Sequence, residues 1–370
     1  MTIAFLPICV LIAAFALATL AVPVSARIAR RFGVLDDPGP RKVHRVPTPR
    51  LGGIAVFTAF AIVVLTGYLG VPVLARIDWV RIHLAAPFAM LQEAYRVEVK
   101  LVAVLVGAAI VFAVGLLDDV LGSRFKVGWK AAGQVLAAVV LVAGGVRTDI
   151  LYYDVLNVAL TLVWVVGITN AFNLLDNMDG LSAGVAFVAS GVLLLNAWLL
   201  GEFFISLVLV AFMGSLLGFL VYNWYPATVF LGDGGSLFIG FTLASLTLLQ
   251  RYVSHASSTY FSVLMPVLVL ALPILDTTTV TFIRLREGRP IYVGDSRHLS
   301  HRLVSLGMRP PLAVFTIYLV SLGVGLGAVG LPHANLVHAL ILLVQALTVV
   351  AVVLILLFYE RRTEPRDAGR

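Results

Sequence analysis

Charge and cysteine are both scarce in this sequence. Only 12% of the 370 residues are charged and 61% are hydrophobic, which gives a mean hydropathy of +1.03. This value lies far above that of a water-soluble globular protein, and no polar stretch is long enough to form a separate soluble domain. Cys9 is the single cysteine, so an intrachain disulfide and a metal site built from cysteines are both excluded.

The short alternating segments of a membrane β-barrel are also absent. The chain contains long apolar runs, many of 18 residues or more, and each of these can cross a bilayer as a helix. We therefore predict an all-α polytopic membrane protein with about eleven transmembrane helices, forming a single integral-membrane domain over residues 1–370. The expected spans are 3–24, 52–74, 99–117, 127–143, 155–168, 181–200, 204–221, 236–249, 262–283, 312–331 and 336–358. The short fifth and eighth spans are expected to extend into the polar motifs beside them.

The distribution of Lys and Arg predicts the orientation of these spans. Most basic residues fall in the loops on one side, which places the N-terminus outside, and the C-terminus with a basic tail at 359–370 in the cytosol. The first apolar run lacks a basic segment before it, so we expect a retained helix rather than a cleaved signal peptide. The net charge of +7 then reflects topology and contact with membrane lipid, not nucleic acid.

Five aspartates lie at or near the ends of apolar runs, all on the predicted cytosolic side. A carboxylate at membrane depth costs roughly 2.5–3.5 kcal/mol on insertion scales and is a functional-site hypothesis by default. Adjacent carboxylates repel, so both ionise readily only beside a cation such as Mg²⁺, which takes one or two carboxylates together with water and substrate phosphate. A solvated helix end is the alternative for the first pair. The five are Asp118, Asp119, Asp176, Asp179 and Asp233.

Asparagines and glycines accompany the later aspartates. Asn173, Asp176 and Asp179 are spaced three apart and share one side of a helical turn, a surface that can bind a metal's water shell, ribose hydroxyls or a base edge. An Asx-rich turn between two spans is the alternative. The stretch 223–236 begins at Asn223 and is rich in glycine, so its backbone can approach a ligand closely. Phe230 in this stretch could stack on a base, and an ordinary re-entrant turn is the alternative.

The stretch 284–311 carries two histidines beside two arginines. His298 and His301 share a face if this segment is helical, and Arg297 and Arg302 complete a cationic patch suited to a pyrophosphate. A zinc site is disfavoured because no third nitrogen ligand is nearby. The alternative to a phosphate-binding patch is a solvated basic loop.

The first predicted cytosolic loop is basic and stiffened by prolines. His44, Arg45 and Arg50 lie in it, just before a glycine pair that enters the second span. They could grip an anionic substrate at the interface, or anchor the loop to anionic lipid.

Asp276 differs from the other aspartates because it lies inside the ninth apolar run. The hydroxyls of Thr277, Thr278 and Thr279 could satisfy its carboxylate. We therefore expect it to face inward and to have a structural role.

Taken together and in order, the motifs between about Arg41 and Arg302 resemble the polyprenyl-phosphate N-acetylhexosamine-1-phosphate transferase family. That family includes phospho-MurNAc-pentapeptide translocase and the GlcNAc-1-phosphate transferases that begin surface polysaccharides. The resemblance implies an enzyme of the inner membrane with its site on the cytosolic face. A UDP-linked amino sugar would donate sugar 1-phosphate to polyprenyl phosphate and release UMP, with Mg²⁺ required and Mn²⁺ as a substitute. A homodimer is a candidate assembly.

The resemblance also implies roles for individual residues. Direct in-line attack by the lipid phosphate is favoured, with Asp118 keeping the acceptor deprotonated, and a two-step route through an aspartyl phosphate is the alternative. The metal would be held by Asp233, Asp118 and Asp119, which with His298 form the catalytic set. The nucleotide would contact Asn173, Asp176, Asp179, Asn223 and Phe230, and the phosphates would contact His44, Arg45, Arg50, Arg297, His301 and Arg302.

Two departures from the pentapeptide translocase point to the polysaccharide-initiating branch. Ser300 stands where many members have a further histidine, and Arg50 follows Pro49 where that enzyme has a different sequence before its glycine pair. GlcNAc is therefore the expected sugar, and MurNAc-pentapeptide is the alternative. A membrane transporter, the alternative from another class, would place its site near the bilayer midplane and often show two related halves. No internal repeat is visible.

Overall fold

The computed structural model describes residues 2–38, 46–78, 97–252, 261–290 and 297–359. Within these ranges, nine helices are long and apolar enough to cross a membrane, and one bent helix pair makes a tenth candidate. The prediction of an all-α polytopic membrane protein is confirmed, whereas the count of eleven spans and their orientation stay predictions. The predicted basic tail lies, from residue 360 on, outside the described residues.

The chain divides into two compact units, Met1–Gln250 and Arg251–Arg370, which are described one at a time. The prediction of one integral-membrane domain is not tested by this division and stays a prediction. The first unit contains the following elements: α1 (Thr2–Phe32), β1 (Leu35–Asp36), β2 (Thr48–Pro49), α2 (Gly52–Leu74), α5 (Glu98–Leu121), η1 (Gly122–Arg124), α6 (Val127–Ala143), α7 (Asp154–Leu175), α8 (Leu181–Leu199), α9 (Phe203–Asn223) and α10 (Gly232–Leu249).

Two helices of the first unit extend into the polar motifs, as the sequence predicts. The fifth predicted span continues to Leu175 as α7, and the eighth begins at Gly232 as α10. These extensions add about one or two turns to spans that were too short to cross a bilayer. They also place the functional side chains on regular helix ends rather than in loose connections.

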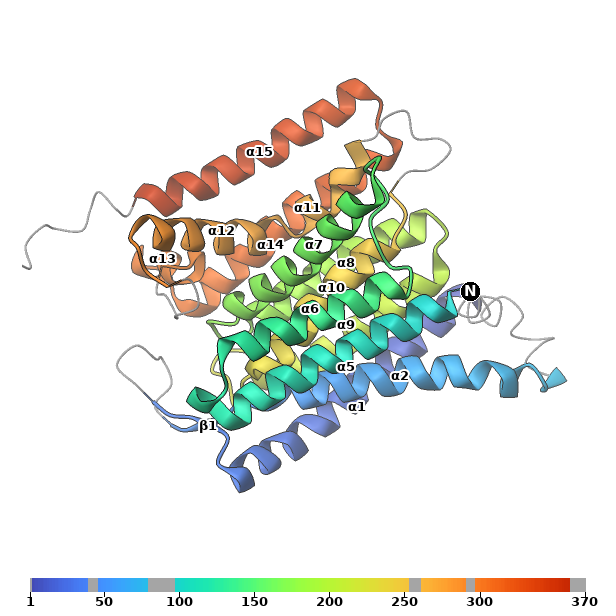
Figure 1. Ribbon diagram of the computed structural model, residues 1–370, viewed down its shortest axis with the longest axis horizontal. Coiled ribbons are helices and arrows are strands. Elements are labelled where there is room, and N and C mark those ends of the chain that lie inside the picture. The colour runs from blue at the N-terminus through green and yellow to red at the C-terminus, as the bar shows by residue number, and fades with distance from the viewer. Residues whose placement is uncertain (1, 39–45, 79–96, 253–260, 291–296, 360–370) are drawn as a thin grey trace, which may run out of the picture. The chain divides into compact units, whose positions relative to one another are not determined.

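Helix α10 is the central helix of the first unit, and it packs against α2, α5, α7 and α8 (Figure 1). In the apolar stretch of α10, 83% of the residues are buried inside the protein, compared with 17% in the apolar stretch of α1. A helix surrounded by protein does not face lipid and can carry small polar residues, which explains the buried Ser236, Thr242 and Ser245. The start of α10 is thus held from several sides at once.

A cluster of aromatic rings joins four helices close to the start of α10. Phe57 of α2 stacks on Phe112 of α5 with ring centroids 4.3 Å apart, and its edge-to-face contact with Phe238 of α10 measures 5.3 Å. Phe60 of α2 meets Phe212 of α9 at 5.8 Å. Each such pair contributes about 0.5–1.5 kcal/mol beyond its buried area. The cluster therefore packs these four helices against one another.

Glycines let the backbones of α2 and α5 approach the first turn of α10. A Cβ atom added at Gly115 of α5 would lie 2.6 Å from the Cα atom of Gly234. One added at Gly53 of α2 would collide with the backbone of Gly235. No side chain fits in either place, so these positions require glycine for steric reasons.

A short hairpin, absent from the all-α expectation, carries the chain from α1 to α2. Strands β1 and β2 pair antiparallel, with Leu35 opposite Pro49. The chain then pairs with the segment before α10: the N–H of Phe230 donates to the Pro49 carbonyl at 2.7 Å, and the N–H of Gly52 donates to the Phe230 carbonyl at 2.9 Å. This ladder fixes the backbone of Arg50, which lies between the two bonded residues.

The second unit contains a broken helix where the sequence predicts one span over 262–283. Helices α11 (Met265–Val269) and α12 (Ala271–Arg286) are bent by 70° relative to each other. Pro273 explains the break, because in a continuous helix its ring would clash with the carbonyl of Val269, where α11 ends. Helix α14 packs against α11, α12, α13 and α15. The elements are η2 (Phe261–Leu264), α11 (Met265–Val269), α12 (Ala271–Arg286), α13 (Leu299–Ser305), α14 (Pro310–Val329), η3 (Leu331–His333) and α15 (Leu336–Tyr359).

The contact between α5 and α10 predicts the effect of one methyl group. We expect Gly115→Ala to destabilise the protein by about 1–3 kcal/mol, because the added methyl overpacks a backbone contact. Gly167→Ala in α7 is the matched control, since a Cβ atom there meets nothing within 4 Å. Thermal unfolding in detergent measures both. Equal melting temperatures for the two variants would contradict the close approach of the helices.

Candidate functional site

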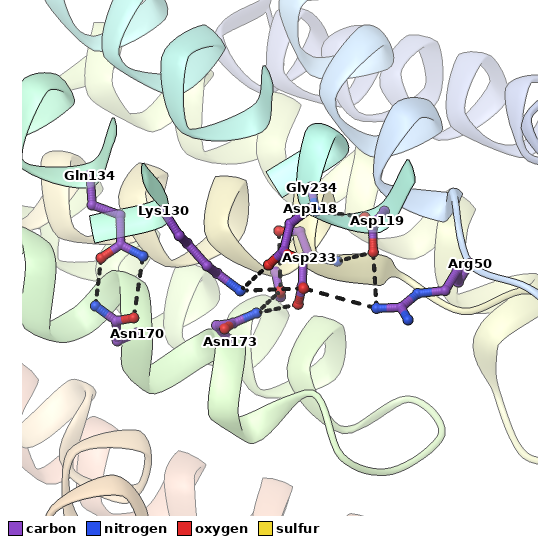
Figure 2. A network of polar contacts seen from close by, with 10 residues as sticks. Arg50, Asp118, Asp119, Lys130, Gln134, Asn170, Asn173, Asp233 and Gly234 are labelled. Atoms are coloured by element: carbon purple, nitrogen blue, oxygen red, sulfur yellow. Dashed lines mark hydrogen bonds and ion pairs between the residues drawn. The ribbon is translucent and has the colours of Figure 1, made fainter. Parts of the chain in front are cut away.

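Three aspartates meet at the start of α10 (Figure 2). Asp118 and Asp119 lie in the last turn of α5, and Asp233 lies in the first turn of α10. Lys130, near the start of α6, and Arg50, just before α2, point toward them. Charged side chains from four segments are thus gathered at one end of the first unit.

Asp119 holds the first turn of α10 from the neighbouring helix. Its Oδ1 accepts the N–H of Asp233 and its Oδ2 accepts the N–H of Gly234, both at 2.9 Å. These amides have no partner inside their own helix, so the carboxylate caps α10 and also matches its positive end. Arg50 Nη2 lies 3.0 Å from Oδ1. The Asp119 side chain is only 2% exposed, so it acts from within the protein rather than from the site's surface.

Lys130 lies between the other two aspartates. Its Nζ is 2.9 Å from Asp118 Oδ2 and 3.3 Å from Asp233 Oδ2. The three side chains are 16–26% exposed, so part of each charge is withdrawn from water. An unpaired carboxylate in such surroundings is strongly destabilising, and the ammonium offsets the repulsion between the two. The three side chains keep some exposure, so the cluster is not closed off from its surroundings.

Lys130 was not predicted to be a site residue. A usable signal was present, because Lys130 is the single charged residue of α6. A lone charge in an apolar helix is a functional hypothesis by the same argument that singled out the aspartates.

Asn173 of α7 orients Asp233. Its side-chain amide donates to Asp233 Oδ1 and to the Ser236 hydroxyl, each at 2.8 Å. One turn earlier, Asn170 exchanges two hydrogen bonds with Gln134 of α6, at 2.6 and 3.2 Å. This amide pair, also missed from the sequence, ties α6 to α7 one turn from Lys130 (Figure 2). Asn173 and Asn170 therefore help to place the carboxylate and the ammonium. The predicted helical face shared by Asn173, Asp176 and Asp179 is not formed, because α7 ends at Leu175.

Two residues predicted to contact a nucleotide, Asp179 and Asn223, join the segment before α8 to the segment after α9. Asp179 Oδ2 accepts the N–H of Ala227 at 2.9 Å. The buried Asn223 accepts the N–H of Gly180 at 3.0 Å and donates to the Val229 carbonyl at 2.9 Å. These bonds join the segment before α8 to the segment between α9 and α10. Their predicted contact with a nucleotide stays a prediction.

Asp176 and Phe230 lie in these same two segments. Burial raises the pKa of the Asp176 carboxyl to about 8, and the negative charges of Asp233 and Asp119 act in the same direction. The backbone of Phe230 is bonded to the segment that carries Arg50, as described above. The predicted contact of these two residues with a nucleotide also stays a prediction.

The remaining predicted residues have different outcomes. Arg50 is brought to the cluster, where its side chain is 33% exposed. His44 and Arg45 lie outside the described residues. The predicted histidine motif lies in the second unit, where Arg297 Nη1 is 2.7 Å from Glu287 Oε1 and the buried Arg302 donates to the Arg297 carbonyl at 2.8 Å. In that unit the predicted shared helical face is only partly formed, because His298 precedes the first residue of α13 and His301 lies within it.

The oxygens of Asp118 and Asp233 are suited to a hard divalent cation. They converge on one point of positive charge, and Mg²⁺ needs only one or two carboxylates when water and phosphate complete its shell. Among the described residues, no group of three or more His, Cys, Asp or Glu side chains is arranged to hold a metal by itself. Asp119 already accepts two amides and faces an arginine. Asp118 and Asp233 are therefore better candidate ligands than Asp119. The metal itself stays a prediction.

The chain is similar to known membrane transferases. Residues 101–251 match the family model described as glycosyl transferase family 4. A probable undecaprenyl-phosphate N-acetylglucosaminyl 1-phosphate transferase from Bacillus subtilis (strain 168) is 33% identical over 323 residues, covering 85% of this chain and 82% of that protein. The decaprenyl-phosphate N-acetylglucosaminephosphotransferase of Mycobacterium tuberculosis (strain ATCC 25618 / H37Rv) is 32% identical, with 79% and 74% covered. The undecaprenyl-phosphate alpha-N-acetylglucosaminyl 1-phosphate transferase of Escherichia coli O157:H7 is 25% identical, with 84% and 80% covered.

The different contacts of the adjacent aspartates predict different effects of the same substitution. We expect Asp119→Asn to destabilise the protein by about 1–3 kcal/mol, because an amide group would then face a backbone N–H of α10. Asp118→Asn should leave the melting temperature nearly unchanged, since it faces the ammonium at the partly open edge. Thermal unfolding of the purified variants makes the comparison. A larger loss for Asp118→Asn would contradict the capping role of Asp119.

Proposed function

The chain belongs to the polyprenyl-phosphate N-acetylhexosamine-1-phosphate transferase family, and we propose that it transfers GlcNAc 1-phosphate from UDP-GlcNAc to polyprenyl phosphate. The product would start a lipid-linked glycan of the cell envelope, and UMP would be released. The observation that carries the proposal is the cluster of Asp118, Lys130 and Asp233 at the end of apolar helices. It supplies carboxylates and a cation in a place that both a lipid-anchored and a water-soluble substrate can reach.

The reaction brings together two substrates that repel each other. An oxygen of the lipid phosphate attacks the sugar-linked phosphorus, a new P–O bond forms, and the bond from that phosphorus to the bridging oxygen breaks as UMP leaves. Catalysis of such transfers rests on positioning and on stabilising the negative charge that spreads over the phosphoryl oxygens. Lys130 supplies a compact positive charge beside the reacting groups, and Arg50 supplies a planar fork suited to a second phosphate.

Each carboxylate has a separate task in this scheme. Asp118 and Asp233 would hold Mg²⁺, which when bound neutralises phosphate charge at the site. Asp118 also keeps the acceptor phosphate deprotonated. Asp119 holds the first turn of α10, and with it Asp233, in place.

The nucleotide would lie along the wall formed by the loops that Asp179 and Asn223 join, with Phe230 and Asp176 beside it. The histidine motif of the second unit, with Arg297 and Arg302, would meet the pyrophosphate.

The sugar and the setting follow from the relatives and the sequence motifs. The relatives described above carry N-acetylglucosamine in their names, and Ser300 and Arg50 depart from the pentapeptide translocase pattern. MurNAc-pentapeptide transfer is therefore not favoured. We place the enzyme in the inner membrane with its site on the cytosolic face, because the basic residues favour that orientation. A homodimer stays a candidate assembly.

A reconstituted assay tests this function directly. Purified full-length protein, polyprenyl phosphate and Mg²⁺ are mixed with a panel of UDP-sugars, and UMP release is measured. We expect UMP with UDP-GlcNAc, and its loss when the divalent cation is removed with EDTA. Asp233→Asn and Lys130→Met should each lower kcat by about 10²–10³-fold, because each removes a charged group from the reacting centre.

The matched control for these variants is Asp154→Asn. Asp154 is an exposed carboxylate at the other end of α7, where it pairs with Arg147 at 3.3 Å. It should retain wild-type activity. Absence of UMP release with every sugar would refute the proposed function, and full activity of Asp233→Asn would remove its metal assignment.

A further inference from the structure

The second unit contains a buried carboxylate–imidazole pair. Asp276 lies in α12, and its Oδ2 is 2.6 Å from Nδ1 of His298, the residue immediately before α13. Both side chains are 3% exposed. A carboxylate withdrawn from water to this degree needs hydrogen-bond partners, and the imidazole is one of them.

The second oxygen of the same carboxylate holds the helix that follows the histidine. Asp276 Oδ1 accepts the N–H of Leu299 at 2.6 Å, and this amide belongs to the first turn of α13. Such an amide has no partner within its own helix. Asp276 thus fixes the imidazole ring and the backbone beside it with one rigid side chain.

The neighbouring threonines do not satisfy Asp276, so that expectation is wrong. Thr278 donates instead to the Ile274 carbonyl at 2.7 Å, as a hydroxyl within a helix commonly does. The Thr277 hydroxyl is buried and has no hydrogen-bond partner among the described residues. The carboxylate is committed to the segment 298–299, which is 22 residues further along the chain.

The carboxylate also determines which ring nitrogen carries a proton. A carboxylate can only accept, so Nδ1 of His298 must be the donor in this contact. Nε2 is then the ring nitrogen left for a substrate, either as an acceptor or, in the imidazolium, as a second donor. An aspartate that fixes a histidine in one orientation and one tautomer is the arrangement found behind catalytic histidines in hydrolases.

We propose that Asp276 is a positioning residue for the transfer reaction, which holds His298 with Nδ1 protonated and Nε2 directed to a substrate phosphate. The proposal rests on the proposed function, because His298 is assigned to the pyrophosphate there. Asp276 itself does not touch substrate. Its effect reaches the reaction through the histidine that it orients.

The kinetic test replaces the carboxylate while keeping its shape. Asp276→Asn presents an amide donor to Nδ1 and so favours the opposite tautomer; the corresponding change in a serine protease lowers kcat by about 10⁴-fold. We expect at least about a 100-fold loss of kcat here with a nearly unchanged KM for the UDP-sugar, and partial recovery in Asp276→Glu, which keeps a carboxylate.

A double-mutant comparison separates positioning from general stability. If Asp276 acts through His298, adding Asp276→Asn to His298→Ala should not reduce activity further than His298→Ala alone. A merely structural aspartate would lower activity by the same factor in both backgrounds. Thr277→Val is the matched control, because it alters the adjacent buried position without removing a hydrogen bond, and it should keep wild-type activity and melting temperature.

A spectroscopic measurement tests the pair without reference to activity. The full chain is labelled with ¹⁵N-histidine in detergent, and the His298 signals are assigned by their absence in His298→Ala. Wild-type protein should show Nδ1 protonated, and Asp276→Asn should show Nδ1 unprotonated. Wild-type His298 protonated at Nε2 alone would overturn the proposal, as would full activity of Asp276→Asn or additive losses in the double mutant. Absence of UMP release by the wild type would instead refute the proposed function. The tautomer measurement would then still decide whether Asp276 fixes the protonated nitrogen of His298.

Discussion

The hydrogen bonds between Asp119 and the first turn of α10 are the interaction on which the site depends. One carboxylate accepts two backbone amides of α10 and faces Arg50, so it joins α5, α10 and the segment leading into α2. Glycines at the same contact allow the backbones to approach this closely. Without these bonds the amides and the carboxylate would be buried without partners, which is costly away from water. The position of Asp233 follows from them.

The two units use the same device. In each, an aspartate from one helix accepts backbone amides at the start of another, two for Asp119 and one for Asp276, and a proposed functional side chain lies at that start. Asp119 serves Asp233 in this way, and Asp276 serves His298. Because a carboxylate has two oxygens on a short, stiff side chain, it can hold a backbone and orient a neighbouring group together. Apolar helices that slide easily in lipid gain a fixed register from such polar contacts.

The helices were predictable from the sequence because apolar runs report directly on membrane spans. The site was predictable only in part. Asp118, Asp119 and Asp233 were expected to meet, since charge in an apolar helix is rarely accidental. The division of roles was not predictable, because the partners of Asp119 come from distant segments. Lys130 was missed although it is the single charged residue of α6. Asp276 was assigned to its neighbouring threonines, although its partners lie 22 and 23 residues further along the chain. The 70° bend within the ninth predicted span was not expected, although Pro273 lies in that span.

The central claim is that the whole sugar 1-phosphate group moves to the lipid at the cluster around Lys130. The most direct measurement supplies UDP-GlcNAc labelled with ¹⁴C in the sugar and ³²P in the sugar-linked phosphate, and follows both labels into the lipid product of the purified protein. The account predicts a lipid that carries the two labels in equal amounts, with unlabelled UMP released. A lipid carrying ¹⁴C without ³²P, which would mean that UDP leaves with that phosphate, would contradict it.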